Sequence, residues 1–309
     1  MIVTVTMNPA IDRTIDIPVL QCGALNRITH VENDAGGKGI NVSKTIKALG
    51  GKSIATGFIG GNAGNIIENT LTSEGIEHDF IRVNGDTRTN TKVVEEGGRV
   101  TELNEKGPKI SEYKINQLMD KLLSYASEET LFVLAGSIPE GVEKDIYGKI
   151  TNLVHKKGAK VFVDADGELF VKSLEAKPDY IKPNDIELAE YCGIKGDITR
   201  EEIVKMAENL IEKGIGNVIV SMGKDGAAFI SHSEKFMCEG LKVKAHSTVG
   251  AGDAMVAAVS YGIADNMSFR ECASLGIATS AGAVTTIGTK PPSRELIDEL
   301  IKGVSCKEF

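Results

Sequence analysis

The sequence of 309 residues is 41% hydrophobic and 25% charged, which is typical of a globular protein and excludes a chain that is mainly disordered. Its 35 Lys and Arg residues against 43 Asp and Glu give a net charge of −8, and without a basic run the chain is a poor candidate for binding nucleic acid. Neither the N-terminus nor the uncharged stretch Cys272–Thr289, which is rich in Ser, Thr and Gly, has the pattern of a signal peptide or a membrane span. We therefore predict a cytoplasmic protein with no membrane contact.

The five cysteines are odd in number, lie far apart and form neither a C-x-x-C pair nor a Cys/His spacing typical of a metal site. Cysteines of cytoplasmic proteins are usually reduced. We therefore predict reduced thiols at all five positions, which are Cys22, Cys192, Cys238, Cys272 and Cys306.

Short apolar runs alternate along the chain with segments of helical periodicity. The predicted strands are Met1–Met7, Ile54–Ile59, Leu131–Ala135, Val161–Asp164 and Val218–Ser221. The predicted helices are Ala63–Glu74, Ser111–Tyr125, Glu143–Lys157, Thr199–Lys213, Ala251–Ala264, Ser268–Thr286 and Ser293–Lys302. This alternation indicates an α/β fold with a mainly parallel central sheet flanked by helices on both faces, and we expect a single domain over residues 1–309.

Two polar, strand-like segments, residues 11–33 and 85–104, interrupt this alternation. In the second, Thr87–Glu95 and Arg99–Leu103 flank Glu96-Gly97-Gly98, a pattern typical of a hairpin turn. Extra antiparallel strands outside a parallel sheet could form a small β lid over sites at the carboxyl ends of the strands. They could equally be an ordinary surface hairpin, and the pattern alone favours neither.

The segment Ser247–Asp253 (STVGAGD) directly precedes the long apolar helix that begins near Ala251. Small residues at a helix start leave the free backbone N–H groups open to an anion. Asp253 lies in the first turn, where a carboxylate is a common stabiliser of the helix. The same carboxylate could accept a hydroxyl proton beside an anion hole, as in phosphoryl transfer, and the residues alone leave both functions open.

A second glycine-rich segment, Ala35–Val42, opens another helix with Lys38 and Asn41 at its start. These side chains are donors for a polar ligand or belong to an exposed turn. Two better-known phosphate motifs are not supported. Gly51-Lys52-Ser53 lacks the upstream glycine of a P-loop, and no G-x-G-x-x-G stands between a strand and a helix.

These segments belong to a longer ordered series of motifs. The series is NPAID (8–12), GGKGINVSKTIKALGG (36–51), GDTRTN (85–90), KPNDIE (182–187), SMGKDG (221–226) and STVGAGD (247–253). Collinear from Met1 to about Ser293, it resembles the ribokinase-like sugar kinases of the phosphofructokinase B (PfkB) family, in particular their phosphosugar-kinase subgroup. The resemblance implies a ribokinase-like fold in which segments 11–33 and 85–104 form the β lid.

The resemblance also implies a reaction, the transfer of the γ-phosphoryl group of ATP to a sugar phosphate. Asp253 would be the catalytic base, and Gly250, Ala251 and Gly252 would form the anion hole around the moving group. The implied acceptor is the 6-hydroxyl of D-fructose 1-phosphate, which gives fructose 1,6-bisphosphate. Tagatose 6-phosphate and fructose 6-phosphate are alternative acceptors for the same mechanism. A sensor that no longer catalyses is disfavoured because Asp253 and the glycines are present.

The implied ligands fall into two sets. The sugar and its own phosphate would be bound by Asp12, Arg27, Gly37, Lys38, Asn41, Arg88 and Ser137. ATP would be bound by Lys182, Asn184, Glu187, Ser221, Gly223, Gly226 and Thr248. Because the protein is acidic, the charge for a second phosphate must be supplied locally, and the cationic side chains of the first set disfavour an unphosphorylated sugar or a nucleoside.

Metal ions and partners complete these expectations. Asn184 and Glu187 are about one helical turn apart and would organise Mg²⁺ through water, although the same pair is also typical of a helix cap. Many family members hold a monovalent cation with an Asp where this chain has Ser247, so strong K⁺ activation is not expected. Carbonyls near Val249, Ala283, Thr286 and Gly288 could still coordinate such an ion. Exposed strand edges and the family likeness predict a homodimer formed through the lid.

Overall fold

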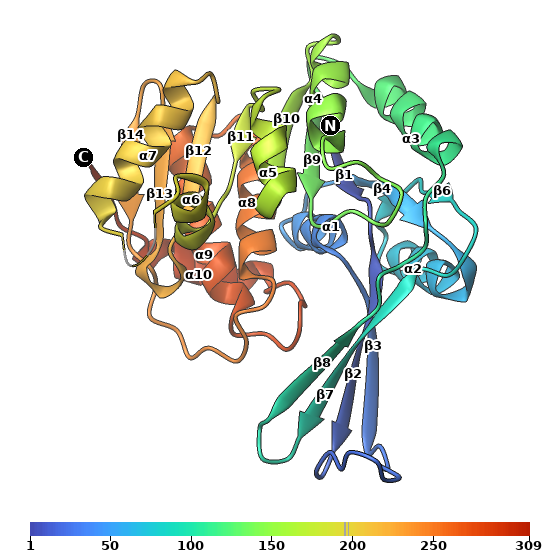
Figure 1. Cartoon of the computed structure of the whole chain (residues 1–309). Coiled ribbons are helices and arrows are strands. Elements are labelled where there is room, and N and C mark those ends of the chain that lie inside the picture. The colour runs from blue at the N-terminus through green and yellow to red at the C-terminus, as the bar shows by residue number, and fades with distance from the viewer. Residues whose placement is uncertain (195, 197) are drawn as a thin grey trace.

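The computed structural model describes residues 1–194, 196 and 198–309, and a large central sheet dominates it (Figure 1). The strand order is β15-β14-β13-β12-β11-β10-β9-β1-β4-β5, with β6 also paired to β4. The parallel strands are β1 (Ile2–Thr6), β4 (Ile54–Ile59), β5 (Glu77–His78), β6 (Ile81–Arg82), β9 (Leu131–Ala135), β10 (Lys160–Asp164), β11 (Tyr180–Ile181) and β12 (Asn217–Ser221). The mainly parallel sheet is therefore confirmed, and each predicted strand agrees to within one residue at either end.

Helices cover both faces of this sheet. They are α1 (Lys38–Ala48), α2 (Gly61–Ser73), α3 (Glu112–Tyr125), α4 (Ile146–His155), α5 (Gly167–Leu174), α6 (Asp185–Tyr191), α7 (Arg200–Glu212), α8 (Ala251–Ala264), α9 (Phe269–Ala283) and α10 (Arg294–Leu300). The helix predicted to end at Thr286 ends at Ala283, because the amides of Thr285 and Thr286 bond three residues back and tighten the chain into a turn. Within the described residues, none of the helices is both long and apolar enough to cross a bilayer.

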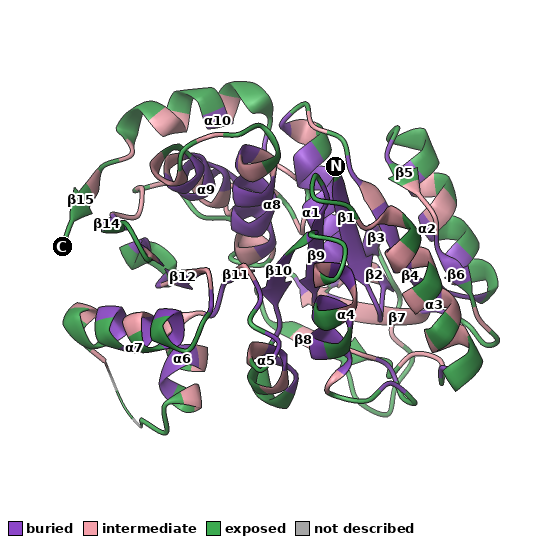
Figure 2. Ribbon diagram, turned by 90° about the horizontal axis from the view of Figure 1, so that it is seen from above, coloured by how far each residue is buried: buried purple, intermediate pink, exposed green. Residues whose placement is uncertain are grey.

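Successive side chains of a strand point to opposite faces of the sheet, so each face of the sheet has its own core. On β1, Val3 and Val5 pack in a cluster with residues of α3, α4, α5 and α7, whereas Ile2 packs with residues of α1, α8 and α9. Figure 2 shows the buried strands between helices whose outer sides are exposed. The sheet is thus a rigid layer from which the loops at its edge project.

One end of the sheet is antiparallel and was not predicted. It consists of β13 (Ala227–Ser231), β14 (Lys235–Cys238) and β15 (Cys306–Glu308). Cys238 and Cys306 face each other across β14 and β15 and form a disulfide, so the prediction of a reduced thiol is wrong for these two residues. They are 68 positions apart, and only strand pairing brings them together. The other three cysteines are free.

The two interrupting segments form a separate four-stranded sheet that extends away from the main body (Figure 1). Its strands are β2 (Ala10–Ile17), β3 (His30–Gly36), β7 (Arg88–Glu95) and β8 (Val100–Asn104), in the order β3-β2-β7-β8. The outer two pairings are antiparallel, as expected, while the central pair β2–β7 is parallel. The hairpin turn after Glu95 is confirmed by the bond from the Gly98 amide to the Glu95 carbonyl.

The parallel strands direct a set of polar residues to one edge. Because β1, β9, β10, β11 and β12 run the same way, the residues that follow them gather where the lid joins the sheet. The helix starts of α1 and α8 reach the same region, since α1 packs beside α8.

Candidate active site

In the part of the chain that the structure describes, the N-terminus of α8 has backbone amides without a side-chain cap, and the Ala251 amide makes only one long bond, to the Thr248 carbonyl at 3.5 Å. Gly250 precedes the helix in the left-handed conformation (φ 84°, ψ −8°), and no side chain of the described residues caps the first turn. A Cβ on Gly252 would lie 3.2 Å from Lys182 Nζ, so a cation stands directly beside the loop. Free amides, a helix dipole and a lysine together suit a phosphate group.

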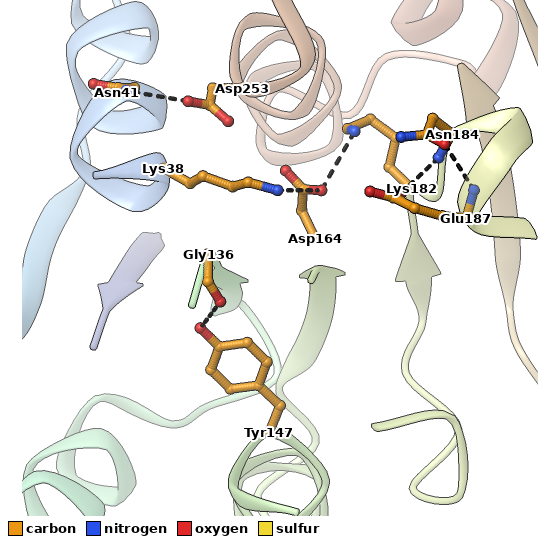
Figure 3. Close-up of polar contacts among 9 residues, drawn as sticks. All are labelled: Lys38, Asn41, Gly136, Tyr147, Asp164, Lys182, Asn184, Glu187 and Asp253. Carbon is orange, nitrogen blue, oxygen red and sulfur yellow. Dashed lines mark hydrogen bonds and ion pairs between the residues drawn. The ribbon is translucent and has the colours of Figure 1, made fainter. Parts of the chain in front are cut away.

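Asp253 lies in this first turn and is only 7% exposed. Its Oδ2 accepts a hydrogen bond from Asn41 Nδ2 at 2.8 Å, which brings two predicted site residues together from α8 and α1 (Figure 3). Burial, and next the charge of Asp164, raises the pKa of Asp253 to about 6, although Asn41, Lys38 and Lys182 act against this rise. A carboxylate with a pKa near neutrality is well matched to accept a proton.

Asp164, at the end of β10, is a site residue that the sequence analysis missed. It is 2% exposed, and its Oδ1 lies 3.3 Å from Lys182 Nζ and 3.5 Å from Lys38 Nζ. Burial raises the pKa of this carboxyl, but the charges of Lys182 and Lys38 outweigh burial and hold it below its usual range. Its position at the carboxyl end of a predicted strand was the one available signal.

Lys38 was expected beside the substrate's own phosphate, together with Arg88. In the structure its side chain extends toward Asp164 (Figure 3). The charge of Asp164, and after it that of Asp253, raises the pKa of the Lys38 ammonium group, although burial opposes this rise. Arg88 lies elsewhere, on β7, where Nε and Nη2 donate to the Asn8 carbonyl at 3.3 and 3.1 Å. Burial lowers the pKa of Arg88, while the nearby charge of Asp12 opposes this shift.

The sugar side of the site is formed by the lid. Asp12 on β2 accepts a hydrogen bond from Asn90 Nδ2 of β7 at 3.1 Å. Both residues line a cleft of about 200 Å³ that Val249 and Thr289 also line. The backbone of Gly36 touches Asp12 so closely that a Cβ there would lie 1.9 Å from its Oδ2. Asn90, quoted only within a motif, thus joins the predicted Asp12.

Two further residues predicted for the substrate differ in their placement. Ser137 is exposed and follows β9 next to Gly136, whose carbonyl accepts a hydrogen bond from the buried Tyr147 hydroxyl at 3.0 Å. Gly136 packs on the stem of Lys38, so Ser137 lies at the site. Arg27 is exposed on the connection between β2 and β3, at the far end of the lid, and is not brought to the site of its own chain (Figure 1).

Most residues predicted for ATP lie along the ends of β11 and β12. Lys182 follows β11, and Ser221 ends β12, where its amide donates to the Pro183 carbonyl at 3.1 Å. Gly223 opens the 3₁₀ turn Gly223–Asp225 with φ 55° and has open space where a Cβ would be. At Gly226 a Cβ would lie 2.0 Å from the Cys238 carbonyl, so the close packing against β14 is enough to require a glycine at this position. Thr248 is exposed just before the α8 loop.

Asn184 and Glu187 form a capping box at the start of α6, which is the helix-cap alternative considered above. Asn184 Oδ1 accepts from the Glu187 amide and Glu187 Oε2 accepts from the Asn184 amide, both at 2.8 Å. Burial raises the pKa of Glu187, and a cation near its remaining oxygen would favour the charged form. The cap fixes the two side chains and uses only one of the two carboxylate oxygens of Glu187.

The residues present fit a magnesium ion held mainly by water and phosphates. Asp164 Oδ2 is buried and has no hydrogen-bond partner among the described residues, which suits a hard cation or its water. The described part of the chain has no group of three or more His, Cys, Asp or Glu residues placed to hold a metal. Mg²⁺ usually keeps several waters and binds one or two carboxylates, and Asp164 and Glu187 would be the residues to hold it here.

Fold and site together define the class of protein, an α/β phosphotransferase with the ribokinase-like fold. Ribokinase from Thermotoga maritima has this fold (TM-score 0.78, 24% identity, 98% of this chain and 99% of that chain). The chain belongs to the pfkB family of carbohydrate kinases, whose family model matches residues 5–296. It is therefore an enzyme that uses ATP, and kinases of this type act with a divalent metal ion.

Relatives are similar over nearly their whole length. The 1-phosphofructokinase of Borreliella burgdorferi is 39% identical over 288 residues, 93% of this chain and 92% of that protein. The 1-phosphofructokinase of Bacillus subtilis is 37% identical over 305 residues, 98% of each. Among solved structures, phosphofructokinase-2 from Escherichia coli in complex with potassium superposes with a TM-score of 0.92 at 28% identity, covering 98% of both chains.

Proposed function

We propose that this enzyme transfers the γ-phosphoryl group of ATP to the 6-hydroxyl of D-fructose 1-phosphate. The observation that carries the choice of substrate is the name 1-phosphofructokinase, shared by relatives that are 33–39% identical over nearly the whole chain. A lid cleft lined by Asp12, with the Arg88 guanidinium near enough to feel the charge of that carboxylate, supports a phosphorylated sugar. Fructose 6-phosphate is the second candidate, favoured by the similarity to phosphofructokinase-2.

The geometry supports a direct transfer between two ligands. Asp12 and Asn90 would hold the sugar hydroxyls, and Asp253 would take the proton from the attacking hydroxyl. The amides of Gly250, Ala251 and Gly252 would stabilise charge on the moving group, and Lys182 would contact the phosphates of ATP. Mg²⁺, when bound through Asp164 and Glu187 with waters, would neutralise phosphate charge. Closure by the lid would exclude water and orient the acceptor.

The test of this function is the release of ADP with each of four acceptors. The purified enzyme is given ATP, Mg²⁺ and fructose 1-phosphate, fructose 6-phosphate, tagatose 6-phosphate or free fructose. We expect the highest kcat/KM with fructose 1-phosphate and almost none with free fructose. An equal or higher value with another sugar phosphate would replace our substrate but keep the chemistry.

Arg88→Gln is expected to raise KM for the phosphosugar about 30-fold while changing kcat less than threefold, because a ground-state ion pair with the substrate's phosphate is lost. The measurement is steady-state kinetics at saturating ATP. Arg82→Gln is the matched control, since Arg82 is exposed on β6 and pairs with Glu68. An unchanged KM in Arg88→Gln would remove Arg88 from the phosphate site.

We also infer a homodimer formed through the lid. Large apolar side chains are exposed there, namely Val19 57%, Leu25 79%, Ile28 46%, Val31 38%, Val100 50% and Leu103 59%. Three of them lie on the edge strands β3 and β8, and the other three lie on the connection between β2 and β3. Exposed apolar side chains that are concentrated in one part of a protein are typical of an interface. The E. coli relative is described as tetrameric in its inhibited form, so larger assemblies occur among similar proteins.

Sedimentation velocity is expected to show a particle of two chains. Leu103→Lys should produce monomers, because it places a charge in the apolar patch of the lid. The matched control is Tyr113→Lys, an exposed aromatic residue on α3 outside the lid. A monomeric wild type, or a Leu103→Lys dimer as stable as the control, would contradict the interface.

For the monovalent cation and the cellular location we keep the expectations from the sequence. Ser247 supplies no charge, and its Oγ accepts from the Val249 amide at 3.2 Å. The Ala283 carbonyl accepts from both the amide and the hydroxyl of Thr286. We propose weak activation by K⁺ at most, and a cytoplasmic location, where ATP is available.

A further inference from the structure

Lys38 lies beside Asp164 and Asp253, next to the candidate catalytic base. It is the first residue of α1, and its side chain passes beneath Asp253 to Asp164 (Figure 3). Gly136 holds its stem, since a Cβ on that glycine would lie 3.4 Å from the Cβ of Lys38. Arg88 is held separately by Asn8 and lies near Asp12. The two cations therefore serve different parts of the site.

Lys38 and Lys182 approach the same oxygen of Asp164 from opposite sides. Lys182 comes from the nucleotide side and stands next to Gly252 of the α8 loop. Lys38 comes from the sugar side, and Asn41 in the same turn of α1 donates to Asp253. An ammonium group has three N–H donors, and each lysine directs one of them at Asp164 Oδ1. The other N–H donors of each lysine could bind a ligand. The space near Lys38 thus has the base and the anion loop as its neighbours.

We propose that Lys38 is a catalytic residue that contacts the phosphoryl group during its transfer, and that Asp164 is the residue that positions it. This inference rests on the proposed function. In the transfer, the sugar hydroxyl oxygen forms a bond to the γ-phosphorus, and the bond from that phosphorus to the bridging oxygen breaks. The electron pair of the broken bond leaves with ADP, and the hydroxyl proton goes to Asp253. Lys38 keeps its protons and stabilises charge on the equatorial oxygens.

The alternative is that Lys38 binds the substrate's own phosphate, as its motif suggested. The two functions predict different kinetics. A residue used only during transfer lowers kcat and leaves KM nearly unchanged when it is removed. A residue that binds the substrate's own phosphate raises KM and leaves kcat nearly unchanged, as we expect for Arg88.

The test is Lys38→Met, which keeps the length of the stem and removes the charge. With the acceptor that the four-sugar panel identifies, we expect kcat to fall about 10²-fold and KM for the sugar to change less than threefold. Lys47→Met is the matched control on α1, because Lys47 is exposed and its Nζ donates to the Gly75 carbonyl. A rise in KM with an unchanged kcat would overturn the inference.

A second measurement separates catalysis from a merely structural pairing with Asp164. Affinity for ADP with aluminium fluoride and the acceptor, which mimics the transfer state, should fall about 10²-fold in Lys38→Met, while affinity for ADP alone should change less than threefold. Equal losses for both would indicate a structural function and overturn the inference. If no acceptor in the panel is phosphorylated, the proposed function fails, and the same kcat comparison on ATP hydrolysis, with water as acceptor, decides the case of Lys38.

Discussion

Asp253→Asn is expected to lower kcat by about 10³–10⁴-fold while leaving the affinity for ATP within about threefold of wild type. Asparagine keeps the size of the side chain and can still accept from Asn41, so the geometry of the α8 turn is preserved. It cannot accept the proton of the attacking hydroxyl. Steady-state kinetics and nucleotide titration measure the two quantities. A turnover near the wild-type value would show that Asp253 is not the base.

The pH dependence gives an independent check on the same residue. Because burial raises the pKa of Asp253 to about 6, kcat/KM should be level above this pH and fall about tenfold per unit below it. The second ionisation of a phosphate monoester lies in the same range. If the carboxyl of residue 253 causes the fall of kcat/KM at acidic pH, Asp253→Glu should shift the pH at which this fall begins. If the substrate's phosphate causes it, that pH should stay the same.

The stability of Asp253→Asn should separate catalysis from folding. A carboxyl whose pKa is raised in the folded state costs stability when it is ionised, so the cost is present above pH 6 and disappears below its unfolded value of 3.8. Asparagine carries no such cost. The free energy of unfolding at pH 7 should not fall below that of wild type and should rise by up to about 3 kcal/mol. Asp265→Asn, at the exposed end of α8, is the matched control and should keep full activity.

The sequence was informative where one residue pattern determines both backbone and chemistry. Gly250 and Gly252 before an apolar run predicted α8 with its correct bounds and an open amide loop, and helical spacing placed Asp253 in its first turn. Asn41 contacts Asp253 because α1, which begins at Lys38, packs beside α8. Their functions still depend on the predictions above.

The features of the fold and the site that the sequence did not predict depend on contacts between distant segments of the chain. Asp164 ends a strand and has no spacing motif, and its partner Lys38 is 126 positions away. The disulfide depends on the pairing of β14 with β15. Because its cysteines are 68 positions apart, the sequence does not show that they are neighbours. Lys38 was assigned from its motif and its charge, and neither distinguishes two phosphates of one reaction. Only the direction of the side chain, toward Asp164, separates them.

Asp164→Asn is expected to lower kcat/KM by about 10³-fold, a larger loss than for Lys38→Met because both lysines lose the group that aligns them. It should also lower the free energy of unfolding at pH 7 by roughly 3 kcal/mol, since Lys182 would keep its charge with only 6% of its side chain exposed. The matched control is Asp166→Asn, two residues along the chain and exposed. Kinetics and denaturant unfolding measure the two effects.

The pH dependence of this stability loss follows from the sign of the shift. The pKa of Asp164 lies below its usual value of 3.8, so its contribution is present at neutral pH and is lost as acid protonates the folded carboxyl. The difference between wild type and Asp164→Asn should therefore be constant above about pH 5 and narrow below pH 4. A difference that is unchanged across this range would mean that packing, not the charge of Asp164, causes it.

Asp164 has a second oxygen whose use the lysines do not explain. Oδ2 is buried without a partner in the described part of the chain, a costly state that a divalent ion or its water would relieve. Asp164→Asn should therefore raise the Mg²⁺ concentration for half-maximal activity about tenfold, whereas Lys38→Met and Asp166→Asn should not. A normal Mg²⁺ requirement combined with a low kcat would show that Asp164 only positions the two lysines. The kinetic and Mg²⁺ measurements together therefore test the function of Oδ1, which faces the lysines, separately from that of Oδ2.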